Sequence, residues 1–251
     1  TIYRSCVPGA DVSLVSTFNL RLMGFEPAGS YAYRNYRSAE AYFRHLFTDK
    51  DIVDASRFHD RLSKIQLYYQ TFASLRRNYE IIEFEPMQYI NIRRLNRIGI
   101  TKDDLEAYCR EVYDFVGEDR FFTVEYLRNL GFTSEIDNLG FSDLFSISLL
   151  RESQYFSNWH LGGNRLFISD RRTSGGRGGG SGAVSSSRLL ASLFDDMTEI
   201  DVDELIGILR DEYNIVLERW KIIEAAGEAS LYYDRIMDRI YCDYDTYFDD
   251  I

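Results

Sequence analysis

The residues of this chain that are best suited to chemistry are arginines that stand close together in the sequence. They form two clusters, one of Arg93, Arg94 and Arg97 near Asn91 and Asn96, and one of Arg171, Arg172 and Arg177. Guanidinium groups in such clusters bind phosphate, because each phosphate that they neutralise releases counterions and so adds affinity. The clusters therefore predict contacts with a nucleic-acid backbone. The alternative is that the first cluster is one solvated face of a helix.

No group of residues has the spacing of a known catalytic motif. The chain has no GxSxG, HExxH or P-loop pattern, and its glycine-rich stretch at 171–187 lacks the GK(S/T) ending of a phosphate loop. Acidic pairs such as Asp195 and Asp196 can act as acid and base, but a solvated acidic face is the better account. We therefore expect no enzyme, no metal site and no cofactor. The histidines are too dispersed to share a metal: His45, His59 and His160.

Charge is distributed unevenly along the sequence. The formal net charge is -11, yet residues 1–175 carry 22 Lys+Arg against 23 Asp+Glu, whereas residues 176–251 carry 7 against 17. An acidic segment repels phosphate, so we expect any nucleic-acid contact to come from the first two thirds. The same asymmetry makes the last third a candidate docking site for a basic protein.

Composition indicates a globular protein with an aromatic-rich core. The chain of 251 residues is 45% hydrophobic and 15% aromatic, which is enough for two or three small domains. Its three cysteines, Cys6, Cys109 and Cys242, are far apart, as is typical of a reducing cytosol. No apolar run reaches the ~20 residues that cross a bilayer, and no signal peptide is present. We expect a cytoplasmic protein without membrane association, and a chain that is a fragment because Thr1 stands where its first module lacks an opening helix.

The central third carries the clearest helix signals. Thr101 and Asp104 have the spacing of a capping box, and an amphipathic stripe follows them up to Gly117. Thr123 opens a second helix that a glycine ends, and Ser142 opens a third. We therefore expect three short helices in succession.

A hairpin is predicted directly after the third helix. The turn residues Gly-Gly-Asn at 162–164 stand between two runs that are rich in aromatic and apolar residues. In the third helix, the expected apolar face leaves Ser146, Ser148 and Arg151 available to solvent. Three short helices followed by such a hairpin are typical of a winged helix.

Three runs of sequence carry a resemblance to a known family: FFTVEYLRNLGF, FSDLFSISLL and YFSNWHLGGNRLFI. They resemble the later helices and the wing of bacterial winged-helix domains, including the HARE-type domain of an RNA polymerase accessory subunit. The resemblance covers residues 100–170 and implies binding to duplex DNA or to the transcription machinery, with the third helix and wing at the groove. By position, it implies contacts from Ser146, Ser148 and Arg151 on the helix and from Asn164 and Arg165 at the wing.

A second pattern is written twice, once near each end of the chain. Both copies read Ser-x-x-Tyr, a gap, and then Tyr-x-(Ser/Asp)-x-x-x-Tyr-Phe-x-x-(Leu/Ile). Ser38 and Asp243 are good N-cap residues, so each copy predicts a short helix with an aromatic pair, and the two copies share a local fold. The first copy contains Ser30, Tyr33, Tyr36, Ser38, Tyr42, Phe43 and Leu46, and the second contains Ser230, Tyr233, Tyr241, Asp243, Tyr247, Phe248 and Ile251.

These patterns together predict a mainly α protein with small β-hairpins, built from repeated winged-helix-like modules joined by a helical bridge. The bridge rests on a helical pattern from about Asp51 to Tyr79, and the glycine-rich stretch is expected to be a flexible linker. The expected domains are a partial winged-helix-like module at 1–50, the helical bridge at 51–88, a winged-helix-like module at 89–170, the linker at 171–187 and an acidic winged-helix-like module at 188–251.

Two functions follow from this architecture. The first is a non-enzymatic module of a bacterial protein in DNA binding or transcription-type regulation, which contacts duplex DNA through Arg93, Arg94, Arg97, Arg171, Arg172 and the helix and wing residues named above. The second is a protein-interaction scaffold in which residues 188–251 dock a basic partner. An enzyme is the third possibility, because distant residues can still converge in space.

Overall fold

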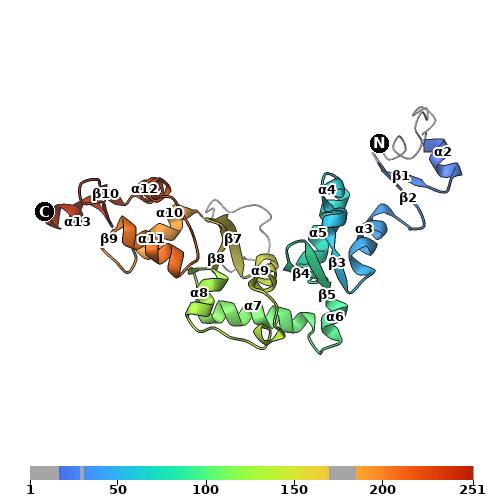
Figure 1. Ribbon diagram of the computed structural model, residues 1–251, viewed down its shortest axis with the longest axis horizontal. Helices are drawn as coiled ribbons and strands as arrows, with labels where there is room; N and C mark the ends of the chain where they lie inside the picture. Colours follow the sequence, from blue (N-terminus) through green and yellow to red (C-terminus); the bar gives the residue numbers. More distant parts are fainter. Residues whose placement is uncertain (1–16, 29–30, 170–184, 251) are drawn as a thin grey trace. The chain divides into compact units, whose positions relative to one another are not determined.

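The computed structural model describes residues 17–28, 31–169 and 185–250 (Figure 1). The chain divides into two compact units, one of Thr1–Ile81 with Met87–Arg94 and one of Ile82–Pro86 with Leu95–Ile251. The predicted linker at 171–187 lies outside the described residues except for its last three, which belong to a helix that Ser185 caps.

The first unit contains short helices and strands up to the first residues of α6. Its elements are α2 (Thr17–Leu22), β1 (Glu26–Ala28), β2 (Tyr31–Tyr33), α3 (Ala39–Thr48), β3 (Ile52–Asp54), the 3-10 turn η2 (Ala55–Arg57), α4 (His59–Leu62), α5 (Gln66–Arg77), β5 (Gln88–Asn91) and α6 (Ile92–Asn96). The unit boundary falls within β4 (Ile81–Glu85) and α6.

The second unit also consists of short helices and short strands. Its elements are α7 (Lys102–Val116), β6 (Phe121–Phe122), α8 (Val124–Asn129), η3 (Asp137–Leu139), α9 (Asp143–Glu152), β7 (Phe156–Leu161), β8 (Asn164–Ser169), α10 (Ser186–Leu193), β9 (Glu199–Asp201), α11 (Val202–Asp211), α12 (Arg219–Glu228), β10 (Tyr232–Asp234), β11 (Arg239–Tyr241) and α13 (Tyr244–Asp250).

The prediction of a mainly α protein is wrong. The described residues are about 50% helical and 19% strand, and they form four small antiparallel sheets. The helical pattern predicted from about Asp51 for the bridge at 51–88 is wrong as well, because β3 lies within it and pairs with β5. Within residues 51–88, the long helix with one buried face is α5, which buries Tyr68, Phe72 and Leu75.

Three successive segments share one order of elements: the first segment (39–91), the second segment (102–169) and the third segment (186–241). Each runs helix, strand, helix, helix, strand, strand, and in each sheet the last strand pairs between the other two, as β3-β5-β4, β6-β8-β7 and β10-β11-β9. In each segment the opening helix packs on the third helix, as the pairs α3 with α5, α7 with α9 and α10 with α12 show. These segments differ in their bounds from the predicted modules at 1–50 and 89–170.

Several helices begin at the side-chain caps that the sequence predicts. Thr101 and Asp104 form the predicted capping box of α7, and the Thr123 hydroxyl accepts from the Tyr126 amide at the start of α8. The repeated pattern is confirmed in the same way, because Ser38 accepts from Ala41 N at 3.1 Å and Asp243 accepts from Thr246 N at 2.7 Å. In both copies the capped helix follows a β-hairpin.

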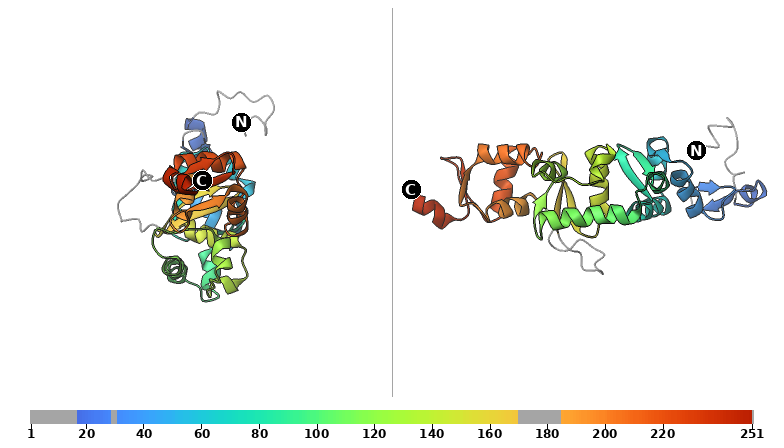
Figure 2. Two further views of the ribbon diagram at one scale, coloured as in Figure 1. Left: turned by 90° about the vertical axis from the view of Figure 1, so that its left-hand side faces the viewer. Right: turned by 90° about the horizontal axis from the view of Figure 1, so that it is seen from below.

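The sheet of the second segment is buried on both faces. Successive side chains of a strand point to opposite faces, so Phe167 lies on one side of β8 and Leu166 and Ile168 lie on the other. Phe167 stacks on Phe122 at 5.4 Å between ring centroids. Leu166 and Ile168 belong instead to one hydrophobic core with α10, α11, α12 and β11. The second and third segments therefore share a core, and Figure 2 shows the orange and red helices of 186–228 grouped beside one another.

The turn of the predicted hairpin β7–β8 packs on the third segment. The Gly162 carbonyl accepts from the Val216 amide at 3.0 Å. A Cβ added to Gly162, which has a φ of +55°, would lie 2.7 Å from both Ile215 Cγ2 and the Val216 carbonyl oxygen. Nearby, the ring of Tyr126 stacks on Tyr213 at 4.5 Å, and burial raises the pKa of the Tyr213 phenol. Gly162 is therefore required by a close approach between two segments.

A pair of glycine substitutions separates this close approach from backbone strain. Gly162 and Gly163 both have positive φ, but a Cβ at Gly163 would meet nothing within 4 Å. We expect Gly163→Ala to lower the free energy of unfolding by about 1 kcal/mol. Gly162→Ala adds overpacking to the strain and lowers it by about 2–4 kcal/mol. Urea denaturation followed by circular dichroism measures both changes, and equal losses would contradict the packed turn.

Candidate functional site

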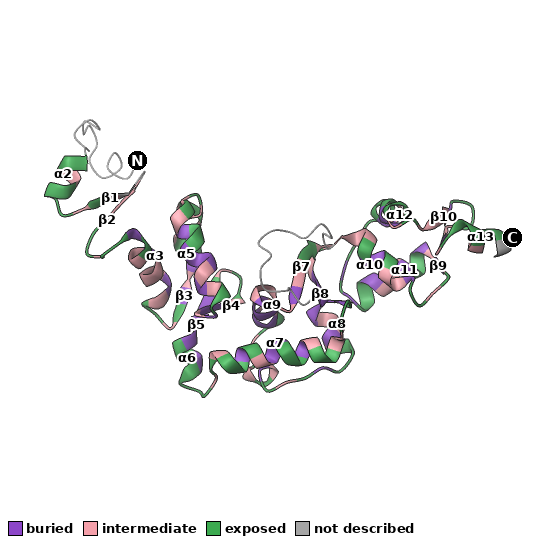
Figure 3. Ribbon diagram, turned by 180° about the vertical axis from the view of Figure 1, so that it is seen from behind, coloured by how far each residue is buried: buried purple, intermediate pink, exposed green. Residues whose placement is uncertain are grey.

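The predicted reading helix, α9, is covered on most of its surface. Ser146 and Ser148 are each only 4% exposed, so the prediction that they face solvent is wrong. Three elements pack on α9, namely α7, α8 and β7, and Figure 3 shows the helix largely in the colour of buried residues. Small side chains at these positions permit the close packing. Neither serine is placed to contact a nucleic acid.

Arg151, the predicted basic residue of this helix, is held by two carboxylates. Its side chain is 18% exposed, with Nη1 3.5 Å from Glu83 Oε2 and Nε 3.2 Å from Glu152 Oε1. Ion pairs of this kind already satisfy the guanidinium group, and breaking a partly buried pair leaves a charge uncompensated. Arg151 is therefore a structural residue of the second unit, and a role as a phosphate ligand is not supported.

The predicted wing residues also make internal contacts. Asn164 Nδ2 donates to the Tyr213 carbonyl at 3.3 Å, and Arg165 Nη1 donates to Asn158 Oδ1 at 2.6 Å. Together with the contact between Gly162 and Val216, these bonds place the turn against the chain at 213–216. A wing that is docked in this way has its tip occupied and does not project toward a groove.

The remaining predicted site residues are arginines near α6 and in the glycine-rich stretch. Arg93 is exposed, but it donates to Asn91 Oδ1 from its backbone amide at 3.0 Å and also donates to the Thr48 carbonyl. Arg94 and Arg97 are exposed. Arg171 and Arg172 lie outside the described residues. Of the ten predicted residues, Arg93, Arg94 and Arg97 are therefore the ones that the structure describes as exposed.

The exposed charged side chains of residues 188–248 are mostly acidic. Residues 188–251 contain 17 Asp+Glu and 6 Lys+Arg. Three of those arginines form ion pairs within the region: Arg210 with Asp211 at 2.7 Å, Arg239 with Glu199 at 2.9 Å, and Arg219 with both Asp203 and Asp238. Exposed carboxylates remain on several elements: Asp195, Glu204, Glu212, Glu218, Glu224, Glu228 and Asp245.

These ion pairs shift the titration of the groups that form them. Hydrogen bonding to Arg210 lowers the pKa of Asp211, and the Tyr233 hydroxyl followed by Arg219 lowers the pKa of Asp238. Carboxylates with lowered pKa values stay ionised at neutral pH. Arg210 and Arg219 thus keep Asp211 and Asp238 in the charged form. The other exposed carboxylates of the region are available to a partner.

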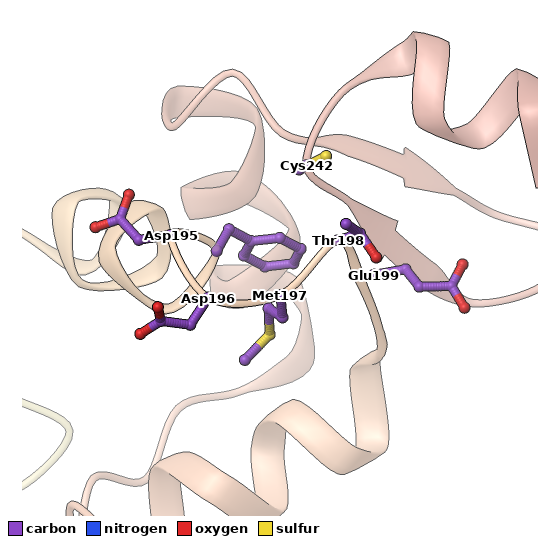
Figure 4. Close-up of a pocket in the computed structure, with 7 residues that line it drawn as sticks. Asp195, Asp196, Met197, Thr198, Glu199 and Cys242 are labelled. Carbon is purple, nitrogen blue, oxygen red and sulfur yellow. The ribbon is translucent and has the colours of Figure 1, made fainter.

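An open depression of about 690 Å³ lies beside the loop that follows α10. It is lined by Phe194, Asp195, Asp196, Met197, Thr198, Glu199 and Cys242. In Figure 4 the carboxylates of Asp195 and Asp196 point away from Cys242, so no acid, base and nucleophile converge there. The Cys242 sulfur lies 3.1 Å from Thr246 Oγ1, which is a local contact within the end of the chain.

The described residues include neither a metal-binding cluster nor a helix that could cross a membrane. Among them, no group of three or more His, Cys, Asp or Glu side chains is close enough to hold a metal ion. Of the helices within 17–28, 31–169 and 185–250, none has the length and apolar character that crossing a membrane requires.

Two serine substitutions test the structural role of α9. The buried Ser148 hydroxyl has no hydrogen-bond partner within the described residues, so we expect Ser148→Ala to raise the free energy of unfolding by about 1 kcal/mol. The control is Ser142→Ala, which removes the same atom from a hydroxyl that donates to the Phe84 carbonyl at 2.7 Å. That change lowers stability by about 0.5–1.5 kcal/mol. Thermal and urea unfolding measure both effects, and a loss of stability in Ser148→Ala would show that this hydroxyl has a partner.

Likeness to known proteins gives no further guide to these residues. The chain matches no protein-family model, and neither a curated protein nor a solved structure matches it. Any function for the chain is therefore inferred from the side chains described above.

Proposed function

We propose that this chain is a non-enzymatic interaction scaffold of the cytosol, and that its acidic region, residues 188–251, docks a basic protein. The observation that carries the proposal is the contrast between the two kinds of charge. The residues expected on the reading helix and the wing, Arg151, Asn164 and Arg165, are held in internal contacts. Carboxylates of the acidic region such as Glu204, Glu224 and Glu228 are exposed. Exposed charge of one sign attracts a partner of the other sign and speeds its approach.

The helix α12 is the part of the acidic region that is best arranged for such docking. Glu224 and Glu228 are both exposed and stand four residues apart, so they lie on one face of the helix. The other face carries Ile222, Ala225 and Ala226, which are buried in the shared core. A rigid helix that presents two carboxylates can accept hydrogen bonds from lysine or arginine side chains of a partner.

Binding to duplex DNA is the weaker of the two proposals. Its support is the order of the second segment, in which three helices precede a hairpin, as the proposed winged-helix resemblance requires. Exposed Arg94 and Arg97 are the described residues through which such binding would act. The reading helix and the wing, by contrast, are engaged elsewhere, as Ser148 and Asn164 illustrate.

A binding assay on the full chain separates the two proposals. At low salt we expect a lysine-rich peptide to bind with an affinity that falls steeply as salt is added, because the attraction is electrostatic. Replacement of Glu224 and Glu228 by Gln weakens binding by about two- to tenfold, at ~0.2–0.7 kcal/mol for each exposed pair. Fluorescence anisotropy of the labelled peptide measures the change.

The matched control is the double variant Glu111→Gln and Asp114→Asn, which removes two exposed carboxylates from α7. It leaves peptide affinity unchanged if the acidic region is the docking site. Failure of the full chain to bind the peptide at low salt would contradict the proposal. Binding of duplex DNA that is lost in Arg94→Ala with Arg97→Ala would favour the nucleic-acid proposal instead.

A further inference from the structure

A run of basic residues lies in the first segment of a chain whose formal net charge is -11. The run spans 55–79, which covers η2, α4 and α5 and belongs entirely to the first unit. Its basic residues are Arg57, Arg61, Lys64, Arg76 and Arg77, and its one acidic residue is Asp60. All of the basic side chains except Arg76 are exposed. This stretch is therefore a positive surface in a chain that is acidic overall.

The helix α5 within this run has one apolar face and one polar face. The apolar face joins the hydrophobic core of the first segment. Gln66, Gln70 and Arg77 are exposed, and their steps of four and seven residues place them on the opposite side of the helix (Figure 3). Tyr69 is 56% exposed beside them. The exposed face of α5 thus carries amide and guanidinium groups and no carboxylate.

The third helices of the other two segments have a different surface. The helix α9 is enclosed by α7, α8 and β7, and its arginine, Arg151, is held by two carboxylates. The helix α12 exposes Glu224 and Glu228. Of the three third helices, α5 is the one whose exposed side chains suit a negatively charged partner.

The positive charge lies at both ends of the exposed face. Lys64 stands in the loop directly before α5, and Arg77 is its last residue. Arg61 donates from Nη2 to the Arg57 carbonyl at 2.8 Å, and this bond to a neutral group leaves its charge intact. Arg57, by contrast, pairs with Asp54 at 3.1 Å, which offsets its charge. Three cations therefore flank the two glutamines.

This arrangement of side chains matches duplex DNA. The major groove of B-form DNA admits an α-helix, and a Gln side chain there can form two hydrogen bonds with N6 and N7 of adenine. Lys and Arg side chains beside the helix neutralise phosphates and release counterions, which adds affinity. Duplex RNA fits less well, because its major groove is too deep and narrow for side chains to read.

We propose that α5 lies in the major groove of duplex DNA, with Gln66 and Gln70 at base edges and with Arg61, Lys64 and Arg77 at phosphates. This site is separate from the acidic region, because the two lie in different units and carry opposite charge. The proposal does not rest on the docking of a basic protein. A chain with both sites brings a basic protein to DNA.

The phosphate contacts are tested by fluorescence anisotropy of the full chain with a short labelled DNA duplex of mixed sequence, over a series of salt concentrations. We expect the logarithm of the affinity to fall linearly with the logarithm of the salt concentration. The triple variant Arg61→Gln, Lys64→Gln and Arg77→Gln makes that slope shallower by about 3, because each lost phosphate contact removes ~0.9.

The matched control removes the same charge from the acidic region. The triple variant Arg188→Gln, Lys221→Gln and Arg235→Gln changes three exposed basic residues and leaves the slope unchanged. An equal change of slope in the two triple variants would overturn the proposal. So would a wild-type chain that does not bind the duplex at low salt, or one that binds a polyglutamate peptide or duplex RNA as tightly as DNA.

Folding of the α5 triple variant is checked by circular dichroism and by its binding to the lysine-rich peptide. Because the three altered side chains are exposed, we expect the native spectrum. Peptide binding that persists while DNA binding weakens shows that the two sites are independent. DNA binding that is lost in Arg94→Ala with Arg97→Ala, but keeps its slope in the α5 variant, would place the contact on α6 and contradict the proposal.

Selection from a pool of random DNA duplexes tests the two glutamines. The wild-type chain should enrich a motif that contains adenine, because Gln forms paired hydrogen bonds with this base. Gln66→Ala with Gln70→Ala keeps the salt slope but reduces the preference for that motif over mixed sequence at least about fivefold, as loss of one such contact does. Enrichment of no motif, or of the same motif to the same extent in the double variant, would overturn the position of α5 in the groove.

Discussion

The burial of the sheet β6-β8-β7 on both faces is the contact on which the rest of the second unit depends. Phe122 and Phe167 cover one face, and Phe121, Leu166 and Ile168 join the core of the third segment on the other. Each of these buried side chains contributes roughly 1.5–3 kcal/mol relative to exposure. Because this one sheet contributes side chains to the cores on both of its faces, the two segments stabilise each other.

This shared core explains why the helix and the hairpin turn that were expected to bind DNA are covered by other parts of the chain. Once the sheet lies between two helical layers, the hairpin turn is brought against residues 213–216, and α9 is enclosed by α7, α8 and β7. Groups that look available in the sequence, such as Ser148 and Asn164, are then part of the interior or of an internal contact. The exposed charged side chains of the third segment are mostly carboxylates, and this is the physical basis for the proposed docking of a basic partner.

Local features of the fold could be predicted from the sequence, and features set by distant contacts could not. The capping box at Thr101, the cap at Asp243 and the glycine turn of β7–β8 depend on residues within a few positions of one another, and all are present. The strand β3 was missed because Val53 pairs with Tyr89, a residue 36 positions later. Short strands stabilised by such pairing have little signal of their own.

The predicted DNA-binding residues show the same difference between local features and features set by distant contacts. A serine between apolar residues of a helix looks solvent-facing, and only the packing of three other elements makes Ser146 and Ser148 buried. One signal was available: the run Leu-Phe-Ile at 166–168 is apolar without alternation, as is typical of a strand covered on both faces. Charge asymmetry, in contrast, is a property of composition, and the sequence alone places it in residues 188–251.

Native-state hydrogen exchange tests the shared core most directly, because it reports the opening free energy of each amide. We expect the amides of β8 and of α11 to open together with one free energy. Leu166→Ala leaves a cavity in the shared core and should lower that free energy in both elements by about 2–5 kcal/mol. If α11 opens independently of β8 and keeps its protection in Leu166→Ala, the second and third segments fold separately and the account is contradicted.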